Sequence, residues 1–368
     1  MRLLYDATPL LMRSAGVKNY HHALLRRLIY VIRRHQIELF PFLRALTPNH
    51  NERSNYPQAA TLLRLGAVLA SNYLHLPVAS RAAARADIFH VTPHLQNVPR
   101  CKRLTSMLHD PTPVTMPEQH TLSNVRYFEG FVHKTLPRLD AVITPSEAVR
   151  RDVAERLGYP AERVRAIPHG VDEDFFDATP AAKQAAHSTY GLPSNYTLFV
   201  GSVEPRKNLV RLVEAFALLP ESLRREYPLV ITGAAGWKNA KIQAAIRRAK
   251  HVSLVGYVSR ELLPAVYHMS SLFVFPSLYE GFGMPLLEAM AAGVPTLTSN
   301  ISALPEVAGD AALLVDPLDL EQMADGMARL LSDRQYAAAL SERARARARL
   351  FTWEICAERT KAFFEDIV

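Results

Sequence analysis

Residues 272–288, LFVFPSLYEGFGMPLLE, constrain the fold of this chain more than any other stretch. They begin with an apolar run typical of a buried strand and continue into a loop. Pro285 then marks the first turn of a helix, and Gly293 marks its end. The free backbone amides at such a helix start can bind an anion, and Gly281 and Gly283 allow a phosphate to approach the loop closely.

Two carboxylates flank this predicted anion site. Glu280 lies in the loop, and Glu288 follows eight positions later, about one turn inside the helix. Backbone amides here can bind a diphosphate while an acidic side chain accepts hydrogen bonds from ribose or sugar hydroxyls. The pattern equally fits an ordinary strand–helix unit with both glutamates solvated, so the local pattern alone leaves both interpretations open.

Length and composition indicate a globular protein of about two domains. The chain has 368 residues, of which 49% are hydrophobic and 21% are charged. The two cysteines, Cys101 and Cys356, fit no metal-ligand spacing. The first residues show no signal-peptide pattern and no apolar run approaches 18 residues, so we expect a cytoplasmic protein.

Charge is shared unevenly between the two halves. Residues 1–170 contain 23 Lys/Arg and 12 Asp/Glu, whereas residues 171–368 contain 20 and 23. A basic half suggests an anionic partner, either a membrane surface, a phosphorylated acceptor or nucleic acid. No nucleic-acid motif accompanies the charge, so we expect membrane or lipid phosphate and no nucleic acid. Arg-rich helices that are simply solvated are the alternative.

The first half alternates strands and helices. Strand 2–7 leads into a loop with Gly16 and a helix over about 17–34, but the dinucleotide fingerprint G-x-G-x-x-G is absent. The alternation predicts a parallel sheet covered on both faces. Further strands are expected at 87–92, 103–110, 141–146 and 163–171. His109 follows a strand on the side where open α/β sheets bind ligands, although a structural role is equally consistent.

The second half repeats the pattern after strand 196–201. Asn208 is expected to cap a helix over 209–219, which places Arg206 and Lys207 beside a second helix start. Further strands are expected at 229–233, 252–256, 294–299 and 312–317. We therefore predict two Rossmann-like α/β domains that face one another across a cleft. The expected boundaries are an acceptor-binding domain at 1–177, a linker at 178–195, a nucleotide-sugar domain at 196–350 and a C-terminal helix at 351–368.

The second half closely resembles the family-4 retaining glycosyltransferases. The resemblance rests on FVGSVEPRKNLVRLVEAF, SLYEGFGMPLLEAMAAGVPTLTSN and ALPEVAGDAALLVDP, and it includes the Glu-x7-Glu pair that is typical of this family. In the first half it is looser and rests on Gly16, His109-Asp110, PSEAVRRDV and PHGVD. It implies the two-Rossmann GT-B architecture, with the C-terminal helix crossing back onto the first domain.

The resemblance also implies roles for individual residues. Arg206 and Lys207 would bind the donor diphosphate, Glu288 the ribose and Glu280 the donor sugar, with His109 facing that sugar from the first domain. The remaining donor-binding residues implied are Gly16, Gly201, Ser202, Val258, Gly281, Phe282, Gly283 and Met284. Two positions depart from many relatives, because Ala15-Gly16 stands for two glycines and Ser202 for an arginine.

The implied reaction is transfer of a hexose with retention of configuration. Departure of the diphosphate needs positive charge, which Arg206, Lys207 and helix amides supply. These cations and amides can act without a metal, so we expect no metal and no cofactor. Resemblance to bacterial polysaccharide enzymes favours mannose from GDP-mannose, followed by UDP-glucose-type and rhamnose donors. The acceptor would be a glycan or polyprenyl-linked glycan at the inner face of the cytoplasmic membrane, with peripheral association to anionic lipid.

Three other functions are compatible with parts of this pattern. A nicotinamide dehydrogenase would need the missing dinucleotide loop, which argues against it. A nucleotide-sugar epimerase shares the architecture but would convert donor without an acceptor. A non-catalytic nucleotide-sugar-binding protein would bind donor without turnover, and the complete set of Glu280, Glu288, Arg206, Lys207 and His109 argues against it.

Overall fold

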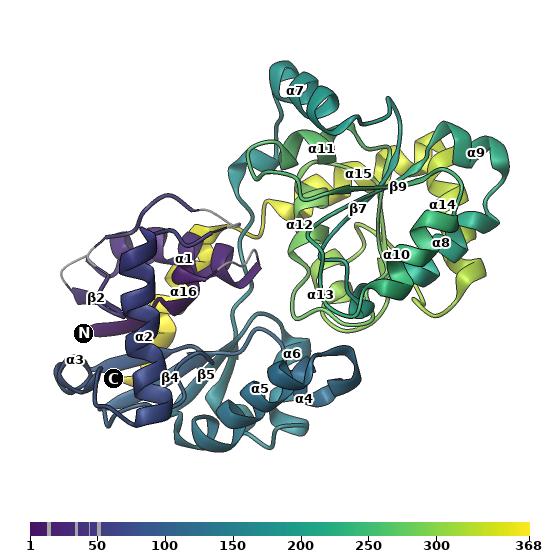
Figure 1. The fold of residues 1–368 in the computed structure, drawn as a ribbon. Coiled ribbons are helices and arrows are strands. Elements are labelled where there is room, and N and C mark those ends of the chain that lie inside the picture. Colours follow the sequence, from purple (N-terminus) through teal and green to yellow (C-terminus); the bar gives the residue numbers. More distant parts are fainter. Residues whose placement is uncertain (13–15, 34–35, 44, 50–52) are drawn as a thin grey trace. The chain divides into compact units, whose positions relative to one another are not determined.

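A computed structural model of the chain describes residues 1–12, 16–33, 36–43, 45–49 and 53–368. The chain divides into two compact units (Figure 1). Unit 1 comprises Met1–Gly170 and Thr352–Val368, and unit 2 comprises Val171–Phe351. Within the described residues, each unit contains a parallel sheet of six strands. The predicted pair of Rossmann-like α/β halves is confirmed, whereas the predicted cleft between them stays a prediction.

The sheet of unit 1 has the strand order β2-β1-β3-β4-β5-β6, and all neighbouring pairs are parallel. Its strands are β1 Leu3–Asp6, β2 Ile37–Phe40, β3 Ile88–Val91, β4 Arg103–Met107, β5 Ala141–Thr144 and β6 Val164–Ala166. The central strands β1, β3 and β5 are buried along their whole length, because helices cover both faces of the sheet. Strand β2 was not predicted.

Helices connect the strands of unit 1 and return the chain to the same edge of the sheet. The α-helices of unit 1 are α1 Gly16–Val31, α2 Gln58–Leu74, α3 Ser80–Arg85, α4 Thr112–Thr115, α5 Leu122–Lys134, α6 Glu147–Glu155 and α16 Trp353–Ile367. Short 3-10 helices lie at η1 Thr8–Leu11, η3 Pro117–Gln119, η4 Leu136–Arg138 and η5 Ala161–Arg163. Ser146 caps α6, since its hydroxyl accepts a hydrogen bond from the Val149 amide at 3.2 Å.

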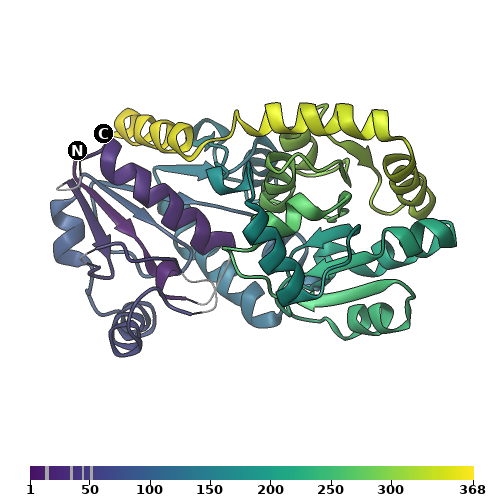
Figure 2. The same ribbon diagram turned by 90° about the horizontal axis from the view of Figure 1, so that it is seen from above.

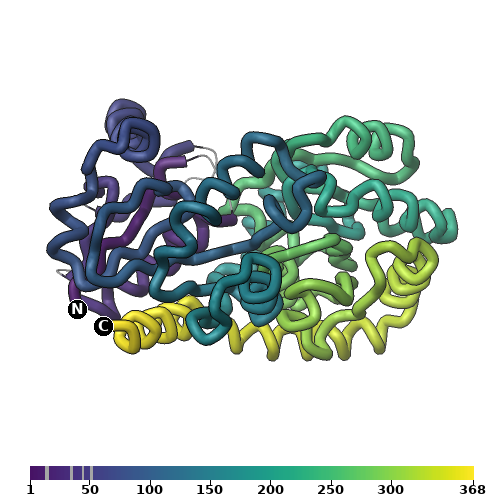
Figure 3. The backbone as a smooth tube through the Cα atoms, turned by 90° about the horizontal axis from the view of Figure 1, so that it is seen from below, coloured from purple at the N-terminus to yellow at the C-terminus, as the bar shows by residue number. Residues whose placement is uncertain are grey.

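The C-terminal helix α16 packs along α1 (Figure 2), so both chain termini belong to unit 1 (Figure 3). Arg27 Nε lies 3.0 Å from Glu354 Oε1, an exposed ion pair that contributes at most about 1 kcal/mol. Phe363 and Phe364 are buried and contribute more, about 1.5–3 kcal/mol each. The predicted return of the C-terminal helix to the first domain is confirmed.

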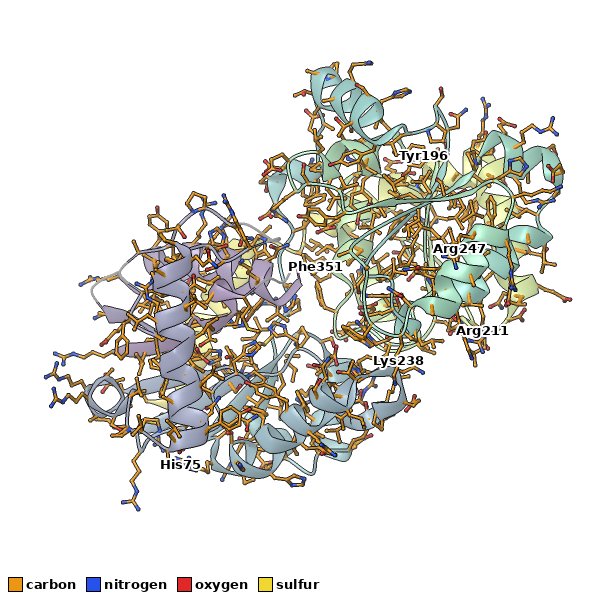
Figure 4. The ribbon with its side chains drawn as sticks, viewed as in Figure 1. His75, Tyr196, Arg211, Lys238, Arg247 and Phe351 are labelled. Atoms are coloured by element: carbon orange, nitrogen blue, oxygen red, sulfur yellow. The ribbon has the colours of Figure 1, made fainter. Side chains whose placement is uncertain are left out.

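The sheet of unit 2 has the strand order β12-β11-β10-β7-β8-β9 and is also parallel throughout. Its strands are β7 Thr197–Val200, β8 Leu229–Thr232, β9 Val252–Gly256, β10 Leu272–Phe275, β11 Thr296–Ser299 and β12 Leu313–Val315. The side chain of Tyr196 lies inside this unit (Figure 4), and its hydroxyl donates to the Val266 carbonyl at 2.5 Å. The strands predicted for this half are confirmed.

Helices of unit 2 include one inside the segment predicted as a linker. The α-helices are α7 Pro180–Tyr190, α8 Leu209–Leu218, α9 Glu221–Glu226, α10 Ala240–Arg248, α11 Leu263–Met269, α12 Met284–Ala291, α13 Leu304–Ala308, α14 Leu320–Ser332 and α15 Arg334–Ala348. The 3-10 helices are η6 Glu173–Phe175 and η7 Pro205–Lys207. Residues 178–195 thus contain α7, which begins at the side-chain cap of Thr179 and packs against α11 within unit 2.

Asn208 does not cap α8 through its side chain, so that prediction is wrong. Its backbone is left-handed, with φ +60°, and its side chain donates instead to the Pro317 carbonyl at 2.6 Å. Only its carbonyl accepts the first helical hydrogen bond, from Leu212. The left-handed turn directs the side chain away from the amides that it was expected to cap.

The alternating arginines of 343–349 are largely structural. Arg347 donates to the carbonyls of Val307 and Glu306 at 2.6 and 2.7 Å, which lie in the last turns of α13. Arg345 donates to the Phe176 carbonyl at 2.7 Å. Positive side chains stabilise helix carboxyl ends, so this run positions α15 against its neighbours. The contacts of Arg345 and Arg347 show that neither side chain is merely solvated.

Gly170 precedes the point where the chain leaves unit 1, and it has no room for a side chain. A Cβ there would lie 2.2 Å from the Trp353 nitrogen and 2.5 Å from the Thr352 carbonyl carbon, both backbone atoms at the start of α16. We expect Gly170→Ala to lower the free energy of unfolding of unit 1 by about 1–3 kcal/mol, because the backbone must move. Urea unfolding followed by Trp353 fluorescence in a Trp237→Phe background measures this.

Gly66, inside α2, provides the matched control. A Cβ at Gly66 meets nothing within 4 Å, so Gly66→Ala should raise the same free energy by about 0.5–1 kcal/mol. Equal stability of the two variants would contradict the proposed close approach at Gly170.

Candidate functional site

The strand–loop–helix predicted from 272–288 is present as β10, a loop and α12. Gly283 directly precedes α12 with φ +106°, a backbone conformation that favours glycine. A Cβ there would also lie 2.8 Å from Leu304 Cδ2, so the loop packs closely on α13. The first amides of α12 consequently sit at the carboxyl end of β10, the edge where open parallel sheets bind ligands.

Three of the predicted site residues form one buried charge cluster. Lys207 Nζ lies 2.5 Å from Glu280 Oε1, and Arg206 lies 3.2 Å from the other oxygen of the same carboxylate. Arg206 also donates to Glu204 at 2.8 Å. These side chains are between 2% and 12% exposed, so solvent screens their interactions weakly. Glu204 was not predicted, although it directly precedes the PRK segment.

The charges in this cluster control the protonation of its members. Burial alone would raise the pKa of the Glu280 carboxyl, but the charges of Lys207 and Arg206 bring that pKa below its ordinary value. Burial lowers the pKa of the Lys207 ammonium, and the Glu280 carboxylate limits this decrease. The result is an ion cluster with two cations beside the start of α12.

Backbone hydrogen bonds fix the two loops that carry this cluster. Arg206 donates to the Tyr279 carbonyl at 2.6 Å, and the Leu278 amide donates back to the Arg206 carbonyl at 2.9 Å. The Glu280 amide donates to Ser302 Oγ at 3.1 Å. The cations therefore have a fixed position before any ligand arrives, which lowers the cost of ordering them on binding.

Glycines bring the ends of β7 and β8 together beside the cluster. A Cβ on Gly233 would lie 1.8 Å from the Gly201 carbonyl oxygen, so only glycine fits there. Gly236 is similarly close to the Val203 carbonyl, at 2.9 Å. The hydroxyl of Ser202 donates to Glu204 at 2.9 Å, which connects this loop to Arg206. The GSVEPRKN and GAAGW segments thus form one packed unit.

Glu288 lies in the second turn of α12 and is a buried carboxyl group. The hydroxyl of Tyr267 donates to its Oε2 at 2.9 Å. Burial raises the pKa of Glu288 to about 7, while the charge of Arg260 and the Tyr267 hydrogen bond oppose this rise. Arg260 in turn forms an ion pair with Asp172, the last residue of the PHGVD motif.

Tyr267 and Arg260 were missed in the sequence. Tyr267 looks like one more apolar helix residue, and Arg260 lies in a loop without a motif. No sequence pattern places either residue near Glu288, because α11 and α12 come together only in the folded chain.

The other residues assigned to donor binding have varied positions. Gly281, Phe282 and Met284 lie in the loop before α12 or at its start, and Phe282 contacts the ring of Phe351 at 5.9 Å. Val258 is a buried core residue after β9. Gly16 begins α1 in unit 1 and is exposed, while Ala15 lies outside the described residues.

His109 also belongs to unit 1, so its predicted approach to the donor sugar stays a prediction. Its ring lies 4.7 Å from that of Tyr20 and 5.6 Å from those of His21 and His169. Burial lowers the pKa of His109 to about 4, with Asp110 opposing the shift. His109 is therefore a neutral imidazole at pH 7, and its Nε2 has no hydrogen-bond partner among the described residues. Trp353 completes this aromatic group from α16.

His90 and His94 are two further histidines of unit 1. His90 is fully buried on β3, and its Nδ1 lies 2.9 Å from Thr105 Oγ1, which indicates a structural role. The ring of His94 lies 6.2 Å from that of Tyr127, near the carboxyl ends of the unit 1 strands. In the described part of the chain, no three His, Cys, Asp or Glu side chains are grouped as metal ligands, and metal independence stays a prediction.

The chain has two Rossmann-like units, and the second carries a basic pair and a helix start beside two glutamates. This combination defines a sugar-nucleotide-dependent class of transferase. Residues 14–175 match the family description Glycosyltransferase Family 4, and residues 183–347 match Glycosyl transferases group 1. The chain is 32% identical over 375 residues to the O-antigen chain mannosyltransferase B of Escherichia coli, and the alignment covers 98% of each chain. The chain therefore belongs to this glycosyltransferase family.

Solved structures agree on the fold. Sucrose-phosphate synthase from Thermosynechococcus elongatus matches with a TM-score of 0.74 and 20% identity, over 100% of this chain and 99% of that one. HepE of Anabaena, solved with UDP and glucose, matches with a TM-score of 0.71 and 17% identity over the whole of both chains. The GT-B fold and the glycosyltransferase class expected from the sequence are confirmed.

The raised pKa of Glu288 predicts a pH-dependent stability. In the unfolded chain Glu288 has its ordinary pKa of 4.5 and loses its proton near that pH. Between pH 4.5 and about 7 the folded protein therefore keeps a proton that the unfolded chain has lost. Stability from this group is therefore full below pH 4.5 and is lost as the pH rises to about 7. Glu288→Gln should raise the free energy of unfolding by about 2–3 kcal/mol at pH 8 and leave it unchanged at pH 4, measured by calorimetry. Destabilisation of the same size at both pH values would contradict this environment.

Proposed function

We propose that this glycosyltransferase transfers mannose from GDP-mannose, with retention, to a glycan or polyprenyl-linked glycan during synthesis of a cell-surface polysaccharide. The observation that carries the proposal is the similarity to an O-antigen chain mannosyltransferase over 98% of both chains. In this proposal the first half of the chain binds the acceptor and the second half binds the donor. Similarity across both halves is therefore better explained by a shared activity than by a shared donor site alone. The UDP and glucose of the HepE complex keep UDP-glucose as the alternative donor.

In this proposal the charge cluster binds the donor diphosphate. Lys207 and Arg206 supply two cations that are already fixed by Glu280 and Glu204. The loop amides at 281–284 and the start of α12 add dipoles of the same sign. Glu280, between the cations and the loop, accepts hydrogen bonds from the donor sugar, and Glu288 accepts them from the ribose hydroxyls.

The reaction breaks the bond between the anomeric carbon and the diphosphate oxygen. Negative charge grows on the leaving diphosphate, so Lys207 and Arg206 stabilise the transition state more than the ground state. Their two charges make a metal ion unnecessary, and no cofactor is required. Retention then follows a same-face route, in which a donor phosphate oxygen takes the proton of the acceptor hydroxyl. Neutral His109 contributes a hydrogen bond to the donor sugar rather than a charge.

The acceptor and its location belong to unit 1 in this proposal. The excess of basic residues in 1–170 supports an anionic surface nearby, namely the inner face of the cytoplasmic membrane. A polyprenyl-linked glycan has its phosphate at that surface, which would bring lipid and acceptor to the same side of the protein.

Lys207→Ala tests the proposed role of the cluster. We expect mannose transfer to slow by roughly 10²–10³, because one charge that stabilises the leaving group is lost. Lys241→Ala, on the exposed side of α10, is the control and should transfer at the rate of the unchanged protein. Circular dichroism confirms that both variants are folded. Near-normal turnover of folded Lys207→Ala, with GDP-mannose as donor, would falsify the assignment.

A further inference from the structure

Helix α2, which stands at the surface of unit 1 in Figure 1, presents leucines to solvent. Leu62, Leu63 and Leu69 are 63%, 78% and 54% exposed, and Tyr73 and Leu74 are 70% and 69% exposed. Of the sixteen large apolar side chains that are exposed in the described residues, six lie between Leu62 and Leu76. A helix at the surface of a globular protein normally turns its leucines toward the core, whereas α2 turns them toward solvent.

Polar contacts fix the rotation of α2 in this unusual orientation. Val68 and Ser71 are buried on the opposite side of the helix, and the Ser71 hydroxyl donates to the Asn97 carbonyl at 3.2 Å. The Asn72 side chain donates to the His94 carbonyl and accepts from the Gln96 amide, each at 2.9 Å. Rotation of α2 to bury its leucines would break these hydrogen bonds. The apolar face is therefore a defined feature of the fold.

The charged residues in the segment that carries this face all have the same sign. Residues 53–86 contain four arginines and neither aspartate nor glutamate. Arg53, Arg81 and Arg85 are exposed, and Arg64 is half-buried beside the ring of Tyr56. His75 follows the last residue of α2 as its C-cap (Figure 4). An apolar face of about 18 Å, in a segment whose charged side chains are all positive, is complementary to a surface that is apolar inside and anionic outside.

We propose that the apolar face of α2 docks on an anionic membrane. This inference rests on the proposed function, in which the acceptor is linked to lipid. The outward face of Leu62, Leu63, Leu69, Tyr73 and Leu74 inserts about 5–10 Å into the boundary between headgroups and acyl chains, while Arg53, Arg81 and Arg85 contact lipid phosphates. The helix lies in the plane of the membrane. In the described part of the chain, no helix has the length and apolarity needed to cross a bilayer.

A second copy of the chain is a less suitable occupant. A symmetric dimer would place the same surface on both sides of the contact, so eight arginines would face one another without a carboxylate from this region. Like charges across an interface disfavour association, whereas anionic lipid neutralises them.

Vesicle flotation of the full chain tests the proposal. Vesicles of phosphatidylcholine with phosphatidylglycerol should bind the unchanged protein, and vesicles of phosphatidylcholine alone should bind it much more weakly. The variant Leu62→Gln/Leu69→Gln/Tyr73→Gln should bind the anionic vesicles at least about tenfold more weakly, because three inserted apolar side chains are lost. Arg81→Gln/Arg85→Gln should weaken binding at low salt and have little effect at high salt.

A matched control uses equally exposed leucines elsewhere. Leu122, Leu218 and Leu318 are 75%, 56% and 58% exposed, and their replacement by glutamine should leave vesicle binding unchanged. Both triple variants should transfer mannose to a water-soluble acceptor glycan at the normal rate, which separates membrane docking from the reaction. Failure of that transfer in the unchanged protein, with vesicle binding intact, would overturn the proposed donor or acceptor and leave the docking surface standing.

Two results would overturn the docking surface. One is normal binding of anionic vesicles by the α2 variant, and the other is no binding by the unchanged protein. If the unchanged protein instead forms a dimer that the α2 variant abolishes, the face belongs to a second copy and the membrane proposal is wrong.

Discussion

The ion cluster of Lys207, Arg206 and Glu280 is the interaction on which the candidate site depends. Two buried cations would normally repel each other and lose hydration, and they are tolerated here because carboxylates and backbone carbonyls surround them. The close contact between Gly201 and Gly233 positions the loop after β7 beside this cluster. The backbone geometry of unit 2 therefore fixes the position of the charged side chains that a donor would contact.

The second unit could be predicted well from sequence because its signals are local. Pro285 and Gly293 bound α12, and Gly283 occupies a backbone conformation that other residues adopt poorly. Glu280 lies in the loop before α12 and Glu288 lies inside that helix, as predicted.

What the sequence could not predict depends on long-range contacts. The side chain of Asn208 is drawn to Pro317, more than 100 positions away, so a local capping rule fails there. The leucines of α2 suggest a core helix, but in the structure they are exposed, and the hydrogen bonds of Ser71 and Asn72 hold this orientation. The raised pKa of Glu288 likewise follows from burial beside Tyr267, which no motif indicates.

Donor binding tests the central claim most directly. Thermal unfolding should be measured with GDP-mannose, UDP-glucose, UDP-GlcNAc and dTDP-rhamnose, each with and without EDTA. At a concentration of about 100 times Kd, a bound donor adds about 2.7 kcal/mol of stability. We expect GDP-mannose alone to raise the melting temperature, to the same extent in EDTA. A shift with another donor, or one that EDTA abolishes, would contradict the account.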